Sequence, residues 1–328
     1  MINMKLSILD QSPISPNETA HDALKGSLNL AQLGESLGYA RYWLTEHHGL
    51  SNLASSAPEV LLAYIGAHTN HIRIGAGAIL LPHYRPYKVA ELFNTLSTLF
   101  PNRVDLGIGR APGGSAEATN ALSTQYLKQV WALPELLEEL LMFLKDDFPA
   151  EHEYNKVAVL PKPDVQPTPW LLGTSEKSAL LAAKNGMPYV FGEFMSEQDG
   201  KAIVQSYREH FQQRNSNVKP EVIVTVSVIC AETTQEAEER AVKSLIPAVQ
   251  GEDKAHKVLE FDQLSEREKE MLYEMKRNII IGNPNVVKKE LQSLRNKYGC
   301  EEIMISTNTI SYEDRVQSYR LIAKALLA

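Results

Sequence analysis

Short apolar runs alternate with helical patterns along the whole chain, and this alternation limits the folds that are open to it. The runs are rich in β-branched and aromatic residues and have the length of single strands. We predict eight strands, at Leu6–Leu9, Ala40–Leu44, Ile72–Ala76, Val104–Ile108, Trp170–Gly173, Tyr189–Gly192, Val222–Ile229 and Glu302–Ile305. Repeated strand–helix units are typical of a parallel sheet, and eight of them predict an α/β protein with a (β/α)8 TIM barrel.

Helical patterns follow each predicted strand. The first helix is predicted to begin near Thr19 and to stop at Gly38, and the last spans Tyr312–Leu327. The chain has no repeat of fixed period, no low-complexity tract and no linker. We therefore expect residues 1–328 to form a single domain.

Two insertions interrupt the alternation. Residues 149–169 contain five prolines and predict an irregular excursion after the fourth unit. A highly charged segment begins at Gln250, after the seventh unit, and continues to residue 281, before the eighth unit opens near Asn283. Its densest part, Gln250–Arg277, is a candidate lid because long segments near a catalytic rim often close over it.

The charge and the cysteines limit the classes of function. A net charge of −7 over 328 residues argues against nucleic-acid binding, which needs a basic face. Cys230 and Cys300 are too few for a secreted disulfide framework and are expected to be buried apolar residues. The first residues lack the pattern of a signal peptide, and no run is long enough to span a membrane, so we expect a cytoplasmic protein.

The motif WLTEHHG, Trp43–Gly49, follows the second predicted strand. Glu46, His47 and His48 should therefore emerge at the carboxyl end of the barrel, where such folds keep their chemistry. Adjacent side chains on an extended segment point to opposite faces, and the spacing of a metal site is missing, so we expect no bound metal. One of the two histidines can be buried and hydrogen-bonded, which leaves the other for function.

The motif DLGIGRAPGG, Asp105–Gly114, lies where the fourth strand turns into its loop. Pro112 occupies the place of the third glycine of a dinucleotide fingerprint, and the GK[ST] of a P-loop is absent. Arg110 among small residues suits an anionic group that approaches backbone amides. The alternative is a tight turn with a solvated arginine.

Two further segments carry open alternatives. Thr174, Ser175 and Ser178 stand at the start of the fifth helix, where hydroxyl groups either cap the helix or hold a phosphate. In the segment IRIGAGAILLPHYRP, the small residues from Gly75 to Ala78 end the third predicted strand. They allow either a flat ring to lie against bare backbone or close packing inside a barrel.

The motifs WLTEHHG, IRIGAGAILLPHYRP, RVDLGIGRAPGG and TSEKSALLAAKNGMP, in this order along the whole length, resemble the bacterial-luciferase-like family of flavin-dependent monooxygenases. The opening LSILDQSPI and the RAPGG loop further resemble a bacterial subgroup of luciferase-like oxidoreductases. The resemblance implies a barrel that takes reduced FMN from a separate flavin reductase and uses O2 to oxygenate a small organic substrate. It also implies a homodimer.

The resemblance assigns roles to particular residues. His47 matches the catalytic histidine that is associated with the flavin intermediate, and Glu46 lies beside it. Gly77 and Ala78 match a pair, joined in relatives by a cis peptide bond, that backs the flavin ring. The residues that match the cofactor-binding loops near the ring and phosphate are Gly109, Arg110, Thr174, Ser175 and Ser178.

One departure from the luciferases concerns Gly109, which stands where luciferase itself has a cysteine near the flavin. The influence of that thiol is absent, so the resemblance does not extend to light emission, nor does any feature identify an aldehyde tunnel. Two alternatives stay open. One is a deazaflavin-dependent hydride-transfer oxidoreductase of the same superfamily, and the other is a non-catalytic barrel protein that only holds FMN.

Overall fold

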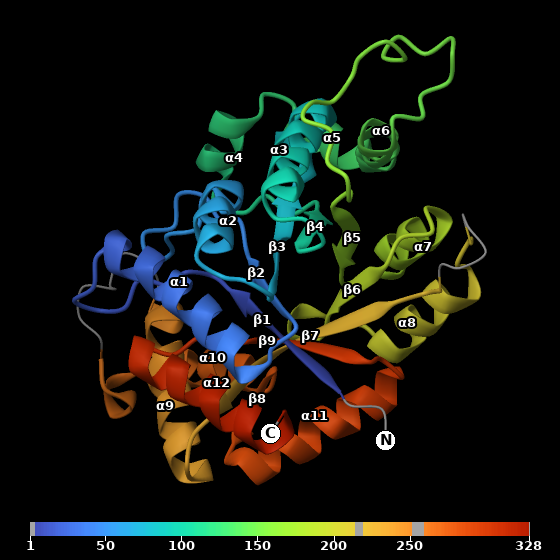
Figure 1. The fold of residues 1–328 in the computed structure, drawn as a ribbon. Helices are drawn as coiled ribbons and strands as arrows, with labels where there is room; N and C mark the ends of the chain where they lie inside the picture. The colour runs from blue at the N-terminus through green and yellow to red at the C-terminus, as the bar shows by residue number, and fades with distance from the viewer. Residues whose placement is uncertain (1–3, 214–218, 251–258, 328) are drawn as a thin grey trace.

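The protein is a closed parallel barrel with helices around it, as the sequence predicts (Figure 1). The computed structural model describes residues 4–213, 219–250 and 259–327. The barrel strands are β1 (Lys5–Asp10), β2 (Arg41–Leu44), β3 (Arg73–Leu80), β4 (Val104–Gly109), β5 (Thr168–Gly173), β6 (Tyr189–Gly192), β7 (Val222–Cys230) and β9 (Glu302–Ser306). Each pairs in parallel with its neighbours, and the β6–β7 and β9–β1 pairings close the ring. The result is a (β/α)8 TIM barrel.

The helices lie outside the strands (Figure 1). They are α1 (Ala20–Leu37), α2 (Pro58–Ala67), α3 (Pro86–Leu99), α4 (Ala116–Leu122), α5 (Tyr126–Trp131), α6 (Leu133–Lys145), α7 (Glu176–Lys184), α8 (Gly200–Glu209), α9 (Thr234–Gln250), α10 (Glu266–Lys276), α11 (Pro284–Tyr298) and α12 (Tyr312–Leu326). Thr19 caps α1 in a capping box with Asp22, and Gly38 ends it with a φ of 84°. Both signals were read correctly from the sequence.

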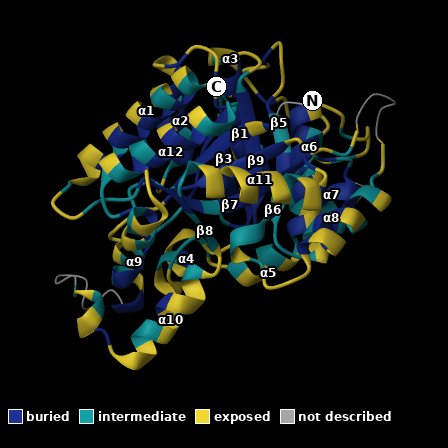
Figure 2. Cartoon of the chain, turned by 90° about the horizontal axis from the view of Figure 1, so that it is seen from below, coloured by how far each residue is buried: buried dark blue, intermediate teal, exposed yellow. Residues whose placement is uncertain are grey.

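Apolar side chains fill the barrel in two layers. Inside the ring of strands a small cluster packs around an edge-on pair of indoles, Trp43 and Trp170, whose ring centroids are 5.8 Å apart. A much larger cluster lies between the strands and the surrounding helices. Figure 2 shows this arrangement as a buried centre with exposure confined to the outer helix faces and loops. The interior is packed, so ligands meet the barrel at its rim.

Charged side chains also lie inside the barrel, where β2, β4 and β9 begin. The Arg41 guanidinium donates to Asp105 Oδ2 at 2.9 Å and to Glu302 Oε1 at 2.8 Å. Arg73 also pairs with Asp105, and the Arg41 guanidinium lies 4.7 Å from the Trp170 ring. The carboxylates raise the pKa of Arg41 against the opposing effect of its burial. This network, which we call the floor network, closes the end of the barrel opposite the catalytic rim.

The structure corrects two boundaries. β3 continues four residues past the predicted end at Ala76, so Gly77 and Ala78 lie inside it. β5 begins at Thr168, which removes the last two residues from the predicted insertion at 149–169. Turn chemistry misled the prediction in the second case, because Pro169 was counted with the other prolines although a proline is tolerated near the start of a strand.

A strand was missed in the second insertion. β8 (Ile279–Gly282) pairs in parallel with the carboxyl half of β7, from Ser227 to Cys230, outside the closed ring. Its four residues follow a charged helical segment, and so short an apolar run is hard to distinguish from the end of a helix.

The charged insertion after α9 is partly packed. In its described part, α10 lies against α9, and Leu264 and Leu272 join a small core with Leu245 and Ile246. Residues 251–258, which include Lys254 and Lys257 of the predicted lid, fall outside the described residues. Among the residues that are described, no helix is long and apolar enough to cross a membrane.

Candidate functional site

Glu46 is the centre of a hydrogen-bonded cluster at the carboxyl end of β2. Its side chain is buried, and its Oε1 accepts hydrogen bonds from His48 Nε2 and from the Tyr84 hydroxyl, each at 2.8 Å. Its Oε2 accepts from the backbone N–H of Leu80 at 2.9 Å. Burial and the nearby Glu46 carboxylate raise the pKa of Tyr84, which therefore stays a donor. The cluster ties the loop after β2 to the end of β3.

His47 has a different environment from its two neighbours. Its Nδ1 lies 2.9 Å from the Thr45 hydroxyl, and its backbone N–H donates to the carbonyl of Ser55 at 2.9 Å. Burial, and then the neighbouring His48, lower the pKa of His47 below its ordinary value of 6.5. The imidazole is therefore neutral at pH 7. With Nδ1 bonded to Thr45, Nε2 is the nitrogen that is available to a ligand.

The RAPGG loop after β4, residues 110–114, docks directly on the loop after β2. The backbone N–H of His48 donates to the carbonyl of Gly113 at 2.8 Å, and His48 forms a β-bridge with Gly114. A Cβ at Gly113 would lie 2.3 Å from Leu80, and its φ is 72°. A Cβ at Gly114 would lie 2.1 Å from the His48 carbonyl. Both glycines are required for this contact.

Two aromatic side chains that the sequence analysis did not single out complete this side of the rim. His83 Nε2 lies 2.9 Å from the carbonyl of Pro112, and its ring stacks on Tyr126 with centroids 4.8 Å apart. The Tyr126 hydroxyl donates to the carbonyl of Arg110 at 2.8 Å. The Arg110 side chain is exposed. His83 and Tyr84 could have been suspected from LPHYRP, whereas no local signal points to Tyr126.

The small residues of β3 and β4 meet at an irregularity. The register between the two strands shifts between Ala76 and Ile79, and the Gly77–Ala78 peptide bond is cis. A Cβ at Gly109 would lie 3.0 Å from the Cβ of Ala78, so the two residues face each other. Gly75 is different, because a Cβ there would lie 2.7 Å from the Trp43 indole nitrogen. Close packing therefore accounts for Gly75.

The hydroxyl groups after β5 are divided between capping and exposure. Ser175 is the N-cap of α7 and forms a capping box with Ser178. The Ser178 hydroxyl donates to the carbonyl of Ser175 at 2.6 Å and lies 3.0 Å from the Tyr189 hydroxyl. Thr174 is half-buried, and within the described residues its hydroxyl has no hydrogen-bond partner.

The structure thus joins some of the predicted site residues and keeps others apart. Glu46, His48 and the RAPGG loop form one connected unit. The hydroxyl-bearing residues Thr174, Ser175 and Ser178 follow β5, which is the neighbour of β4 in the sheet. In the described part of the chain, no hydrogen bond joins Arg110 to these hydroxyls. They would have to be bridged by a ligand.

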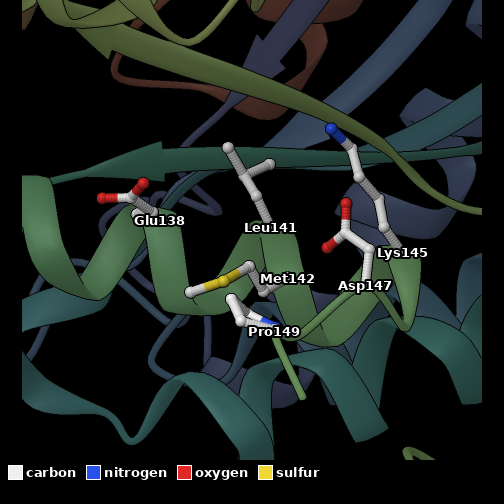
Figure 3. A pocket seen from close by; sticks show the side chains of 6 residues that line it. All are labelled: Glu138, Leu141, Met142, Lys145, Asp147 and Pro149. Carbon is white, nitrogen blue, oxygen red and sulfur yellow. The ribbon is translucent and has the colours of Figure 1, made fainter. Parts of the chain in front are cut away.

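Two surface hollows are lined by other residues than those of the site described above. One of about 210 Å³ sits against α6 and the turn that follows it (Figure 3). A second, of about 620 Å³, lies between α9, α10 and β8. The helices α4, α5 and α10 gather on the side of the molecule opposite the N-terminus (Figure 2). Within the described residues, no group of three His, Cys, Asp or Glu side chains could hold a metal ion.

Comparison with known proteins gives a consistent family. Residues 4–300 match the model of the luciferase-like monooxygenase family. The chain is 38% identical to the N-acetyl-S-alkylcysteine monooxygenase of Bacillus subtilis, and the match covers 99% of each chain. The crystal structure of apo-MsnO8 is 32% identical, with a TM-score of 0.85, over 99% of this chain and 98% of the other.

A more distant structure has the same fold with different chemistry. An F420-dependent secondary alcohol dehydrogenase has a TM-score of 0.71 over 99% of both chains, at 14% sequence identity. That likeness concerns the fold alone. The family match covers nearly the whole chain and agrees with relatives above 30% identity, so this protein belongs to the luciferase-like monooxygenase family.

Proposed function

We propose that this protein is a flavin-dependent monooxygenase that uses reduced FMN and O2 to oxygenate a small organic substrate. The observation that carries the proposal is the connection between two loops of the rim. The loop that bears the neutral imidazole of His47 is locked to the RAPGG loop, which bears the exposed Arg110. An acid–base group and an anion-binding group are thereby held in one frame.

The residues present fit FMN. Arg110 offers a charged, bidentate donor to a phosphate, and the amino terminus of α7 adds the hydroxyls of Thr174 and Ser175. Ser178 would have to give up its bond to the Ser175 carbonyl to donate to the phosphate. Gly77, Ala78 and Gly109 are small and buried where β3 and β4 meet at the cis peptide bond, and we propose that the flavin ring lies over this irregularity.

Bound reduced FMN would supply the two electrons with which O2 gives one oxygen atom to the substrate and one to water. The protein contributes position and proton control. His47 would hold or move a proton at Nε2, because its Nδ1 is oriented by Thr45. Glu46 holds His48 and the rim in place, since its acceptor positions are already occupied within the protein.

The substrate class is suggested by similarity. The 38% identical relative is named as an N-acetyl-S-alkylcysteine monooxygenase, so N-acetylated S-alkylcysteines are the first compounds to test. We also propose that a separate flavin reductase supplies the reduced FMN and that the protein is a homodimer, which sedimentation velocity measures directly.

The two alternatives differ from this proposal in their use of oxygen. A deazaflavin-dependent hydride-transfer oxidoreductase would turn over without O2, and a non-catalytic FMN-binding barrel would not turn over at all. The deazaflavin alternative is less favoured because the F420-dependent dehydrogenase is only 14% identical, against 38% for a monooxygenase. Substrate-dependent O2 consumption with reduced FMN, and none with reduced deazaflavin, is the expected result.

Arg110→Ala should weaken the binding of reduced FMN about tenfold or more, because a hydrogen bond to a charged group contributes roughly 1.5–3 kcal/mol. Anaerobic titration calorimetry measures the affinity directly. Lys128→Ala is the matched control, since it removes an exposed cation from α5 on the same side of the barrel. An equal loss in both variants would indicate diffuse attraction of an anion and would contradict a specific phosphate site.

A further inference from the structure

The RAPGG loop is held by its carbonyl groups. Three of them accept hydrogen bonds from outside the loop: Arg110 O from the Tyr126 hydroxyl, Pro112 O from His83 Nε2 and Gly113 O from the His48 N–H. The three distances are 2.8, 2.9 and 2.8 Å. The donors come from α5, from the turn after β3 and from the loop after β2. A five-residue loop is thereby fixed from three directions.

His83 and Tyr126 act as one unit. Their rings are stacked, with centroids 4.8 Å apart and planes 21° apart, and His83 also meets His48 edge to face at 5.9 Å. Because the Pro112 carbonyl can only accept, His83 donates to it from Nε2. His83 Nδ1 is buried and, within the described residues, has no hydrogen-bond partner. The contacts of the His83 imidazole are therefore with the RAPGG loop and with the Tyr126 ring.

The position of α5 depends on this contact more than on burial. No residue of α5 is buried, and its outer face exposes Leu127 at 73% and Trp131 at 80%. A helix with so little buried surface gains little from the hydrophobic effect. The stack on His83 and the bond to Arg110 are therefore what seat Tyr126 against the rim.

We infer that Tyr126 and His83 are positioning residues for the phosphate of FMN, a role that rests on the function proposed above. Arg110 itself is exposed, and a long flexible side chain loses affinity when its backbone is also free to move. Tyr126 holds the backbone carbonyl of Arg110, and His83 holds the loop two residues further on. The Arg110 guanidinium thereby reaches a phosphate from a backbone that is held in place.

Tyr126→Phe tests this role, because it removes the hydroxyl and keeps the ring on His83. We expect the affinity for reduced FMN to fall about fivefold, as for the loss of one uncharged hydrogen bond. The affinity for reduced riboflavin, which has the ring system but no phosphate, should not change. A merely structural loss would weaken both ligands alike, so the ratio of the two affinities is the readout.

Two further measurements sharpen the test. Tyr87→Phe is the matched control, since the Tyr87 hydroxyl also donates to a backbone carbonyl, that of Ala158, outside the site residues. It should leave the FMN-to-riboflavin ratio unchanged. In the Arg110→Ala background, Tyr126→Phe should cause no further loss of FMN affinity, because the two residues serve one contact.

The outcomes separate this inference from the proposed function. Wild-type protein that binds FMN no better than riboflavin would contradict the phosphate site itself. Wild-type protein that prefers FMN, with the same preference in Tyr126→Phe, would overturn the positioning role and leave the proposed function standing. Additive losses in the double variant would likewise overturn it.

Discussion

Neighbouring residues of one short motif take opposite roles at the scale of single side chains. Glu46 is buried, and both of its oxygens already accept hydrogen bonds from within the protein. His47, the next residue, keeps one ring nitrogen free and has a lowered pKa. This contrast supports our proposal that His47 is the acid–base group, whereas Glu46 holds the rim through His48, Tyr84 and the backbone of Leu80.

His47→Ala should preserve the affinity for FMN and lower the yield of oxygenated product per reduced FMN consumed, with hydrogen peroxide making up the difference. The wild-type yield should be constant above pH 6.5 and fall only below it, because the lowered pKa keeps the imidazole neutral down to that pH. The yield of the variant should lack this fall. His68→Ala, at an exposed histidine after α2, is the control, and an unchanged product yield in His47→Ala would remove His47 from the mechanism.

The sequence placed the motif residues correctly but not their partners. WLTEHHG follows a strand, and position after a strand is a local property that residue patterns report. The contacts of Glu46 with Tyr84 and with Leu80 join segments more than thirty residues apart. Such contacts depend on how β2 and β3 are aligned, which no single sequence pattern encodes.

At the scale of elements, the stability of the barrel depends on its strands and helices, and the floor network is a buried group of charges where three strands begin. Arg41 is buried between two carboxylates, and removing it leaves Asp105 and Glu302 without their shared cation. A buried charge without a partner costs much more than an exposed one.

Arg41→Met should therefore lower the free energy of unfolding by about 3–5 kcal/mol. The matched control is Lys88→Met, which breaks an exposed pair with Glu91 and should cost at most about 1 kcal/mol. Urea unfolding followed by circular dichroism measures both. Equal losses in the two variants would show that Arg73 alone is enough to neutralise Asp105.

The elements that were found and missed show which structures a residue pattern can predict. The eight barrel strands were found because each is an apolar run between turn signals. β8 escaped because its four residues carry no period long enough to recognise, and α10 was taken as part of a charged lid. Leu264 and Leu272 nevertheless give α10 a small core with α9. A lid that opens by moving α10 would have to break that core, so the lid remains a prediction for the rest of the segment.

At the scale of the whole molecule, the reactivity of the two cysteines reports whether the barrel is closed. Cys230 ends β7 and Cys300 precedes β9, and both are buried and free. Burial raises the pKa of Cys230 to about 12 and that of Cys300 to about 11. The thiolate is the form that attacks thiol reagents, so both residues should be inert while the barrel is closed.

Native protein at pH 8 should accordingly show no thiol that reacts with Ellman's reagent, whereas protein unfolded in urea should show two. The labelling rate in native buffer then measures how often the barrel opens. Prompt labelling of a single thiol, identified by mass spectrometry, would instead mean that the structure around that cysteine opens locally.

β8 gives an otherwise closed barrel one unpaired strand edge. A ring of strands leaves no unpaired backbone, but β8 is bonded to β7 on one side and to no other described strand on its second side. Its three consecutive isoleucines, Ile279–Ile281, are only half-buried, and a second chain could add there as a further strand. β8 is short, and α9 and α11 pack against it, so the exposed edge that it offers to a second chain is small.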